Sequence, residues 1–371
     1  MAIEEKLVKA GPKKLLALDG GGIRGIITLK IIERIESLLR ERFADPGLVL
    51  ADYFDYIAGT STGAIIATFL SMGLPVEQIR AFYVDAGPGM FAPARLRDRL
   101  TNRFSPDGLK DILQRELGAE TDLGSDRLKT LLMLVMRNAS TNSPWPVSNN
   151  PRAKYNDVAL ADCNLRLPLW QLIRASTAAP TFFPPEVFVL DGKEHIFVDG
   201  GISVYNNPSF QLFLMATLEP YNVGWPVGED EMLIVSVGTG VGPRPMASDL
   251  RVEQMNVLYN AASIPSALIA AASVEQDLLC RTFGKVRAGA VLDSEIGDLI
   301  GVPAPGGQRK MFTYMRYDVD LTRKGLDRLG LPAIEPTTVQ PLDKVDNIGG
   351  LLTVGAAAAD SLVHKRHFDG F

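Results

Sequence analysis

The chain has 371 residues, of which 46% are hydrophobic and 22% charged, which is enough for the core of one large α/β domain or two modest ones. Its formal net charge of −5, from 38 basic and 43 acidic residues, argues against a nucleic-acid-binding protein. Three histidines, two cysteines and no calcium-binding loop give no metal-ligand spacing, so we expect neither a metal nor another cofactor.

The first predicted strand, Lys14 to Leu18, is followed by a glycine-rich loop from Asp19 to Gly25, and a helix from Ile26 to Arg40 comes next. Gly20, Gly22 and Gly25 match a dinucleotide-binding turn, in which backbone amides and a helix N-terminus receive a pyrophosphate. That fold would next need a strand ending in an acidic residue, whereas here the next strand leads into a serine-containing turn. A nucleotide-binding protein using Gly20 to Gly25 is therefore one alternative.

The same loop also suits acyl transfer. Backbone amides that can face a phosphate can equally face the oxyanion of a tetrahedral intermediate, and glycines let a substrate carbonyl approach closely. On this interpretation Gly20, Gly21 and Gly22 form an oxyanion hole, with Gly21 and Gly22 as the expected donors. Arg24 would brace the loop or attract an anionic headgroup, and a solvated arginine in the first helical turn is the alternative.

A short apolar strand is predicted from Tyr53 to Ala58, and a helix is predicted from Thr62 to Met72. Between them lies Gly59-Thr60-Ser61-Thr62-Gly63, which has the Gly-x-Ser-x-Gly spacing of a nucleophile elbow. The strand, the tight turn and the helix come in the order that such an elbow requires. Ser61 is therefore a candidate nucleophile, and an ordinary glycine-rich turn is the alternative.

A serine nucleophile needs a base, and a histidine base would have to be His195, His364 or His367. His364 and His367 lie in a polar tail, which is a poor place for a buried imidazole. His195 lies in a predicted strand, Glu194 to Val198, whose alternation puts residues 195, 197 and 199 on one face. A histidine base at position 195 therefore stays open, as does a surface position for this side chain.

Further strands are predicted in chain order, and they alternate with helical stretches. They are Leu128 to Met136, Glu186 to Leu190, Glu194 to Val198 and Met232 to Val237. Segments 140–154 and 301–310 are rich in proline, asparagine and glycine and are predicted to be loops. This alternation predicts an α/β fold with a mostly parallel central sheet and helices on both faces.

Four motifs together resemble the patatin-like phospholipases. They are the Gly-Gly-Gly-x-Arg-Gly loop, the Gly-x-Ser-x-Gly elbow, the block from Leu172 to Phe183 and the turn Asp199-Gly200-Gly201, in this order and spacing. The resemblance covers residues 14–210 and continues more loosely through Met232 to Gly240. It implies a three-layer patatin-like fold and a Ser-Asp dyad without histidine, with Ser61 as nucleophile and Asp199 as base.

The resemblance implies a metal-independent lipid acyl hydrolase of the phospholipase A or lysophospholipase type, which cleaves carboxylic esters of membrane glycerophospholipids through an acyl-serine intermediate. A catalytically idle lipid-binding module is a second alternative. We expect a single catalytic domain over residues 1–371, with the motifs in about 14–210 and further strands and helices in about 211–371. A homo-oligomer or a small-molecule activator is compatible with the sequence, and 252–283 is a candidate region for such control.

The expected location is the cytoplasm, with peripheral contact to a membrane. The charged N-terminus does not resemble a signal peptide, no run reaches about 18 apolar residues, and the cysteines form no disulfide framework. Residues 87–105 mix arginines with apolar side chains, which suits a lid or docking segment on anionic lipid. A solvated loop and surface helix is the alternative interpretation of that segment.

Overall fold

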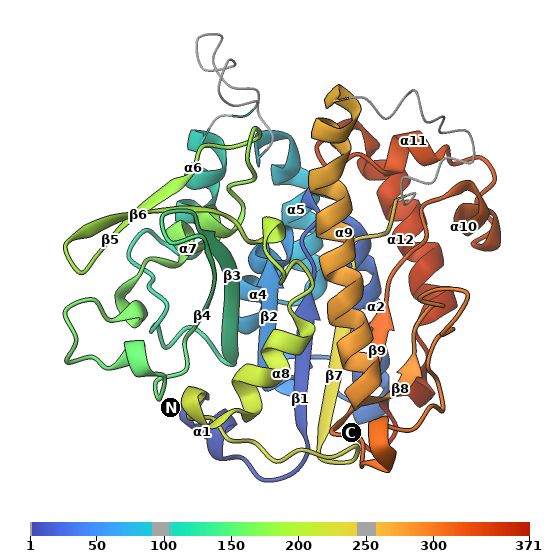
Figure 1. Ribbon diagram of the computed structural model, residues 1–371, viewed down its shortest axis with the longest axis horizontal. Helices are drawn as coiled ribbons and strands as arrows, with labels where there is room; N and C mark the ends of the chain where they lie inside the picture. Colours follow the sequence, from blue (N-terminus) through green and yellow to red (C-terminus); the bar gives the residue numbers. More distant parts are fainter. Residues whose placement is uncertain (1, 91–103, 105, 243–256) are drawn as a thin grey trace.

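The computed structural model describes residues 2–90, 104, 106–242 and 257–371 (Figure 1). Within them, nine strands form one sheet in the order β5-β6-β3-β2-β1-β7-β9-β8, with β4 paired to β3 outside this path. The strands are β1 Lys13–Leu18, β2 Tyr56–Thr60, β3 Leu131–Asn138, β4 Ser143–Ser148, β5 Glu186–Leu190, β6 Lys193–Asp199, β7 Met232–Val237, β8 Gly284–Ala288 and β9 Phe312–Tyr317.

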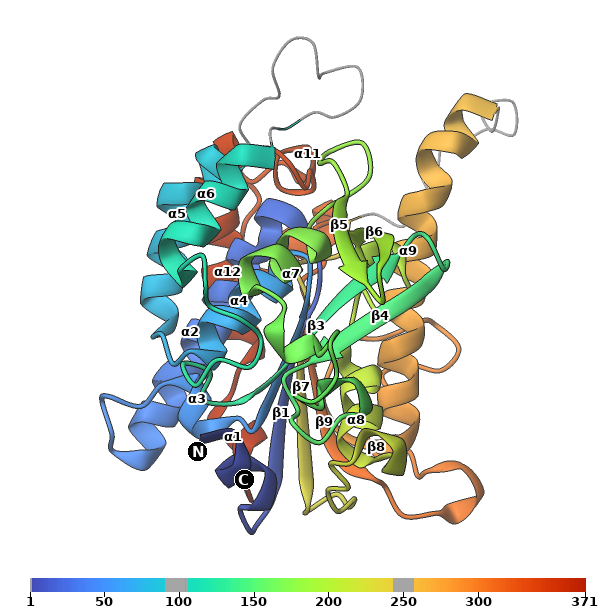
Figure 2. The ribbon, with the colours of Figure 1, turned by 90° about the vertical axis from the view of Figure 1, so that its left-hand side faces the viewer.

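Helices cover both faces of the sheet, as Figure 2 shows along its edge. The helices are α1 Ala2–Val8, α2 Gly25–Phe43, α3 Leu50–Tyr53, α4 Thr62–Ser71, α5 Val76–Met90, α6 Pro106–Leu117, α7 Leu169–Ser176, α8 Ser209–Thr217, α9 Val257–Phe283, α10 Arg323–Arg328, α11 Pro336–Val339 and α12 Ile348–Leu362. The predicted α/β class with helices on both faces is confirmed.

Alternation along β1 explains the three layers. Leu16 and Leu18 belong to the core under α2, α4, α5 and α12, whereas Leu15 and Ala17 belong to a second core under α8 and α9. Successive side chains of a strand point to opposite faces, so a strand buried on both faces is apolar throughout. The two cores therefore lie on opposite faces of the sheet.

The sheet is mostly parallel, as predicted. Among the described residues, five pairs are parallel: β1 with β2, β1 with β7, β2 with β3, β7 with β9, and β8 with β9. The antiparallel pairs are β3 with β4, β3 with β6, and β5 with β6. The predicted strands at Lys14, Glu186, Glu194 and Met232 are confirmed within a residue at each end.

Several details of the prediction were wrong. The strand predicted at Leu128 to Met136 is β3, which runs from Leu131 to Asn138. β2 begins at Tyr56 rather than Tyr53, because Leu50–Tyr53 forms a helical turn in which the Asp52 carboxylate accepts the Val49 N–H. β4 lies inside the segment 140–154 that was predicted to be a loop, and β8 and β9 were not predicted. Residues 91–103 and 105, which hold most of the predicted docking segment, lie outside the described residues. In the described part of the chain, no helix combines the length and apolar character needed to span a bilayer.

Candidate active site

The register on β3 brings two distant parts of the chain together. Thr60, the last residue of β2, pairs with Val135, and Asp199, the last residue of β6, pairs with the next residue, Met136. β4 pairs with residues 133–138 of β3 and so occupies its other edge, which places β2 and β6 end to end along one edge. The turn after Thr60 therefore meets the end of β6.

Ser61 occupies this turn in a strained conformation. Its φ of 54° and ψ of −122° lie where glycine is strongly favoured, and helix α4 begins at the next residue. The flanking glycines allow close packing: a Cβ on Gly59 would lie 2.1 Å from the Gly63 carbonyl oxygen, and one on Gly63 would lie 2.3 Å from the Leu18 oxygen. The turn has the geometry of a nucleophile elbow.

Ser61 donates two hydrogen bonds to groups outside the turn. Its Oγ donates to Oδ2 of Asp199 at 2.7 Å. Its backbone N–H donates to Ser176 Oγ at 2.9 Å, and that hydroxyl donates to the Val135 carbonyl oxygen at 2.5 Å. Ser176 thereby ties the strained turn to β3, a contact that sequence reasoning missed although Ser176 lies in the block 172–183.

The carboxylate of Asp199 is buried, with 5% of the residue exposed. Its second oxygen, Oδ1, accepts the N–H of Gly201 at 2.6 Å. Burial raises the pKa of Asp199 to about 6, against the lowering effect of the hydrogen bonds from Ser61 and Gly201. Asp199 is therefore a stronger base than an ordinary aspartate and is still ionised at neutral pH.

The glycine loop lies beside this pair. A Cβ on Gly20 would lie 3.3 Å from Ser61 Cβ. The Gly20 N–H donates to the Asn206 carbonyl oxygen at 3.1 Å, so this amide is already engaged and is not free to bind an oxyanion. Within the described residues, no acceptor takes the N–H of Gly21 or Gly22. These two amides stay the predicted donors.

Arg24 joins the loop to the segment before α12. Its Nη1 donates to the Gln340 carbonyl oxygen at 3.3 Å, and the neighbouring Ile23 N–H donates to the Leu342 carbonyl oxygen at 2.9 Å. Burial lowers the pKa of Arg24 to about 10, which leaves it charged at neutral pH. A contact to an anionic headgroup stays a prediction.

Two of the three histidine side chains have hydrogen-bond partners other than Ser61. His195 Nδ1 lies 3.1 Å from Asn138 Nδ2. His367 is buried against Tyr317, with Nδ1 2.9 Å from the phenol oxygen, and burial lowers its pKa to about 4. The expectation that the polar tail is a poor place for a buried imidazole was therefore wrong for His367, because Tyr317 of β9 supplies a partner. The group bonded to Ser61 Oγ is the Asp199 carboxylate.

A buried ion pair lies behind the glycine loop. Arg316 of β9 donates to both oxygens of Asp19, at 2.8 and 2.6 Å, and also to Asp318 at 2.6 Å. Burial raises the pKa of Asp19 to about 6, and the two aspartates raise the pKa of Arg316 well above its usual value. Both partners are charged at neutral pH. No motif in the sequence indicated this contact between positions 19 and 316.

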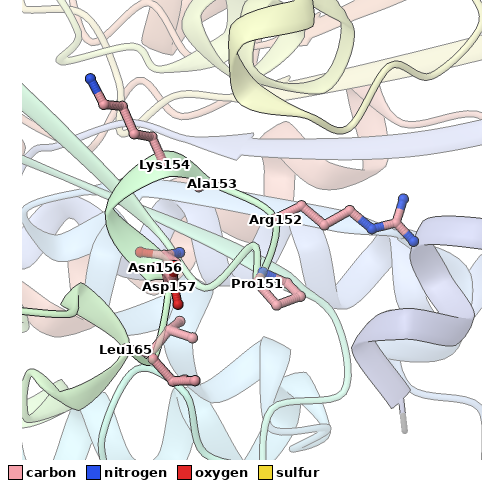
Figure 3. Close-up of a pocket in the computed structure, with 8 residues that line it drawn as sticks. Pro151, Arg152, Ala153, Lys154, Asn156, Asp157 and Leu165 are labelled. Carbon is pink, nitrogen blue, oxygen red and sulfur yellow. The ribbon is translucent and has the colours of Figure 1, made fainter. Parts of the chain in front are cut away.

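No group of three or more potential metal ligands occurs among the described residues. A surface hollow of about 540 Å³ lies in the segment 151–165, and its lining includes neither Ser61 nor Asp199 (Figure 3). Arg152 reaches from the hollow toward α1, where it donates to Glu4 at 2.9 Å. This hollow is separate from the candidate site.

Residues 16–213 match the family model of the patatin-like phospholipases, and the chain belongs to this family. It is 30% identical over 243 residues to Patatin-17 of Solanum cardiophyllum, which covers 61% of this chain and 60% of that protein. It is 28% identical over 235 residues to the cGAMP-activated phospholipase of Escherichia coli, covering 61% and 62%. It is 29% identical over 278 residues to the intracellular phospholipase A2 of Caenorhabditis elegans, covering 72% and 23%.

The family membership confirms the resemblance predicted from the four motifs. Family membership also disfavours the dinucleotide-binding alternative. The strand after the glycine loop disfavours it too, because β2 leads into Ser61 rather than ending at an acidic residue. The matches to the first two of these relatives span about three fifths of their length.

Proposed function

We propose that the chain is a lipid acyl hydrolase of the phospholipase A or lysophospholipase type, which cleaves carboxylic ester bonds of membrane glycerophospholipids through an acyl-Ser61 intermediate. One observation carries the proposal: Ser61 Oγ, in a strained elbow, donates to the buried Asp199 carboxylate at 2.7 Å. The family supports the substrate class, since relatives from two organisms are named phospholipases.

In the proposed acylation, Ser61 Oγ attacks the ester carbonyl carbon while Asp199 Oδ2 takes the hydroxyl proton. The carbonyl π bond breaks and its oxygen becomes an oxyanion. The amides of Gly21 and Gly22 and the N-terminus of α4 would stabilise this charge, because both present N–H groups that need no reorganisation. Removing one such donor typically costs about 3–4 kcal/mol of transition-state stabilisation.

The intermediate then collapses. The bond between the carbonyl carbon and the alcohol oxygen breaks, and Asp199 returns its proton to that oxygen, which releases the lysolipid or alcohol. Water attacks the acyl-serine while Asp199 takes a water proton, and the second collapse returns this proton to Ser61 Oγ and frees the fatty acid. Asp199 ends each cycle ionised, which suits a carboxyl group with a pKa of about 6.

The wider predictions are part of this proposal. Residues 1–371 would act as one catalytic domain, because β7, β8 and β9 of the C-terminal part extend the same sheet as β1 and β2. A cytoplasmic protein that contacts membranes peripherally fits the substrate class. The Escherichia coli relative is named for its activation by cGAMP, and an activator or a homo-oligomer stays a prediction for this chain.

Mass spectrometry after labelling with a fluorophosphonate probe tests the dyad. We expect the wild type and His195→Ala to be labelled on Ser61, and Ser61→Ala and Asp199→Asn to lose both labelling and hydrolysis of phospholipid vesicles. Circular dichroism of each variant controls for folding. A folded His195→Ala protein without activity would restore a histidine base. A wild type that binds vesicles and neither labels nor turns over would establish the idle lipid-binding module instead.

A further inference from the structure

The turn after β7 holds the glycine loop by one side chain. Thr239 is buried, and its Oγ1 donates to the Gly20 carbonyl oxygen at 3.1 Å. A Cβ on Gly21 would lie 2.0 Å from the same Oγ1, so the loop backbone packs directly against this threonine. Thr239 lies in the stretch Met232 to Gly240, which resembles the family only loosely and which the proposed mechanism does not use.

The geometry of a peptide unit gives this contact a consequence. The Gly20 carbonyl and the Gly21 N–H belong to one planar trans peptide, in which the two groups point in opposite directions. A hydroxyl that holds the Gly20 oxygen therefore also sets the direction of the Gly21 N–H, away from Thr239. If this peptide rotated by half a turn, a carbonyl oxygen would replace the N–H and would repel an oxyanion.

We propose that Thr239 is a positioning residue, which orients the Gly20–Gly21 peptide so that the Gly21 N–H is available to the oxyanion. This inference rests on the proposed hydrolase function and adds a residue to it. Thr239 touches the loop and not the reacting atoms, so it acts through Gly21.

The preceding peptide is fixed as well. The Gly20 N–H donates to the Asn206 carbonyl oxygen at 3.1 Å, and Asn206 Nδ2 donates to Ser273 Oγ of α9 at 3.0 Å. Both polar groups of Gly20 are thus held, the N–H by Asn206 and the carbonyl by Thr239. The loop meets the substrate in a preset orientation, which is what an oxyanion hole needs.

The turn that carries Thr239 is itself fixed by three hydrogen bonds. The Gly238 N–H donates to the Tyr317 oxygen at 2.8 Å, the Gly238 carbonyl accepts from Thr28 Oγ1 at 2.8 Å, and the Gly240 N–H donates to Asp318 Oδ1 at 2.9 Å. Asp318 in turn binds Arg316, so the ion pair behind the loop also supports the turn. Thr239 can therefore impose an orientation on Gly20 rather than follow it.

A set of three substitutions separates the hydroxyl from the packing. Thr239→Val keeps the shape and loses the donor, Thr239→Ala loses both, and Thr239→Ser keeps the donor and loses the methyl group. On a soluble ester substrate we expect Val and Ala to lower kcat about 10-fold or more with KM little changed, since an oxyanion donor acts mainly in the transition state. Thr239→Ser should stay within about 3-fold of the wild type.

The binding of two inhibitors gives an independent readout. A trifluoromethyl ketone, which forms a tetrahedral adduct with the serine, should lose affinity in Thr239→Val by about the same factor as kcat. A non-hydrolysable ether lipid should bind as it does to the wild type. Melting temperatures show whether each variant is folded.

If kcat followed the size of the side chain, with Thr239→Val near the wild type and Thr239→Ser as impaired as Thr239→Ala, the role of Thr239 would be packing and the proposal would be overturned. Wild-type kcat in both Val and Ala would overturn it as well. The proposed function fails separately, through an active Ser61→Ala protein, so the two failures are distinguishable.

Discussion

Arg316 and Asp19 face each other through two parallel hydrogen bonds, of 2.8 and 2.6 Å, in the interior of the protein. Arg316 is 6% exposed and Asp19 is 4% exposed. This bidentate pair joins β9 to the residue that opens the glycine loop, and Ser236 Oγ of β7 lies 2.7 Å from the same guanidinium. Three strands are thereby connected at the end of the sheet where the candidate site lies.

Arg316→Met should destabilise the protein strongly, because it leaves the buried Asp19 and the partly buried Asp318 without their cation. Removing one partner of a buried pair typically costs about 3–5 kcal/mol. Arg328→Met is the matched control: Arg328 donates to Asp320 at 2.6 Å, but its side chain is 64% exposed, and an exposed pair is worth at most about 1 kcal/mol. Urea unfolding measures both, and equal losses would contradict the importance of burial.

The pH dependence of hydrolysis should report Asp199. The proposed base must be ionised, and burial raises its pKa to about 6, so kcat/KM should fall about tenfold for each pH unit below that value. The measurement uses a soluble ester between pH 4.5 and 9, with circular dichroism at each pH to follow folding. A rate that is flat down to pH 5 in a folded protein would argue against Asp199 as the base.

Asp199 should also affect the free energy of unfolding, and this contribution should fall as pH rises, whereas the rate of hydrolysis should rise. Its folded pKa of about 6 lies above the unfolded value, so the folded protein binds this proton more tightly, and the stabilising contribution is complete below about pH 4 and lost as pH rises through 6. Asp199→Asn removes this titration. From pH 4 to 7, the variant should gain stability relative to the wild type, by up to about 3 kcal/mol in chemical unfolding. A pH-independent difference would contradict the raised pKa.

The strain at Ser61 should be measurable by comparing two substitutions. Both Ser61→Ala and Ser61→Gly lose the bond to Asp199, but only glycine adopts a φ of 54° and ψ of −122° without strain. We expect Gly to be more stable than Ala by about 1 kcal/mol. At Ala357, inside α12, the helical backbone favours alanine instead, so Ala357→Gly should lower the free energy of unfolding by about 1 kcal/mol. A more stable Ser61→Ala protein would mean that the turn carries no strain.

Two glycines at the same helical position should respond differently to alanine. Gly63 and Gly349 are each the second residue of a helix, α4 and α12. A Cβ on Gly63 would lie 2.3 Å from the Leu18 oxygen and 2.8 Å from the Asp19 oxygen, whereas among the described residues no atom beyond its chain neighbours and its own helical turn lies within 4 Å of a Cβ on Gly349. Thermal unfolding should show a loss of about 2 kcal/mol or more for Gly63→Ala and a small gain for Gly349→Ala. Similar melting temperatures would contradict the close approach.

The strands that the sequence predicted well are marked by one clear local pattern, an apolar run that ends at a glycine-containing turn. β1 ends in four apolar residues and β7 is apolar except for Ser236, and glycines mark the turns after them, so their positions followed from the local residue pattern alone. β4 was missed because Pro144 and Pro146 suggest a loop. In the structure they lie in an edge strand that pairs only with β3, where a missing N–H costs little.

β9 was missed because its pattern misleads. Thr313 and Arg316 interrupt the apolar run on opposite faces of the strand, which weakens the pattern of a buried strand, yet both side chains are buried because each finds a polar partner. Those partners, at Glu229 and Asp19, lie 84 and 297 positions away. No local pattern encodes such distant contacts.

The candidate site divides in the same way. Ser61 has a local signature, and Asp199 followed from the family resemblance, whereas their meeting depends on the pairing of β2 and β6 with adjacent residues of β3. No motif in the sequence marks Ser176 or Thr239. Their hydroxyls form hydrogen bonds with Ser61 and Gly20 only once the chain has folded. The catalytic roles of these residues stay predictions.

The hairpin of β5 and β6 carries Asp199, and the ladder between β6 and β3 is short: it has three residue pairs, Met136 with Asp199, Arg137 with Val198 and Asn138 with Phe197, and one further hydrogen bond from the Ala139 N–H to the Ile196 carbonyl oxygen. Such a short ladder can detach locally while the rest of the sheet stays intact. Gentle warming would then separate the carboxylate from Ser61 before the helices melt. Inactivation would precede the loss of secondary structure and reverse on cooling.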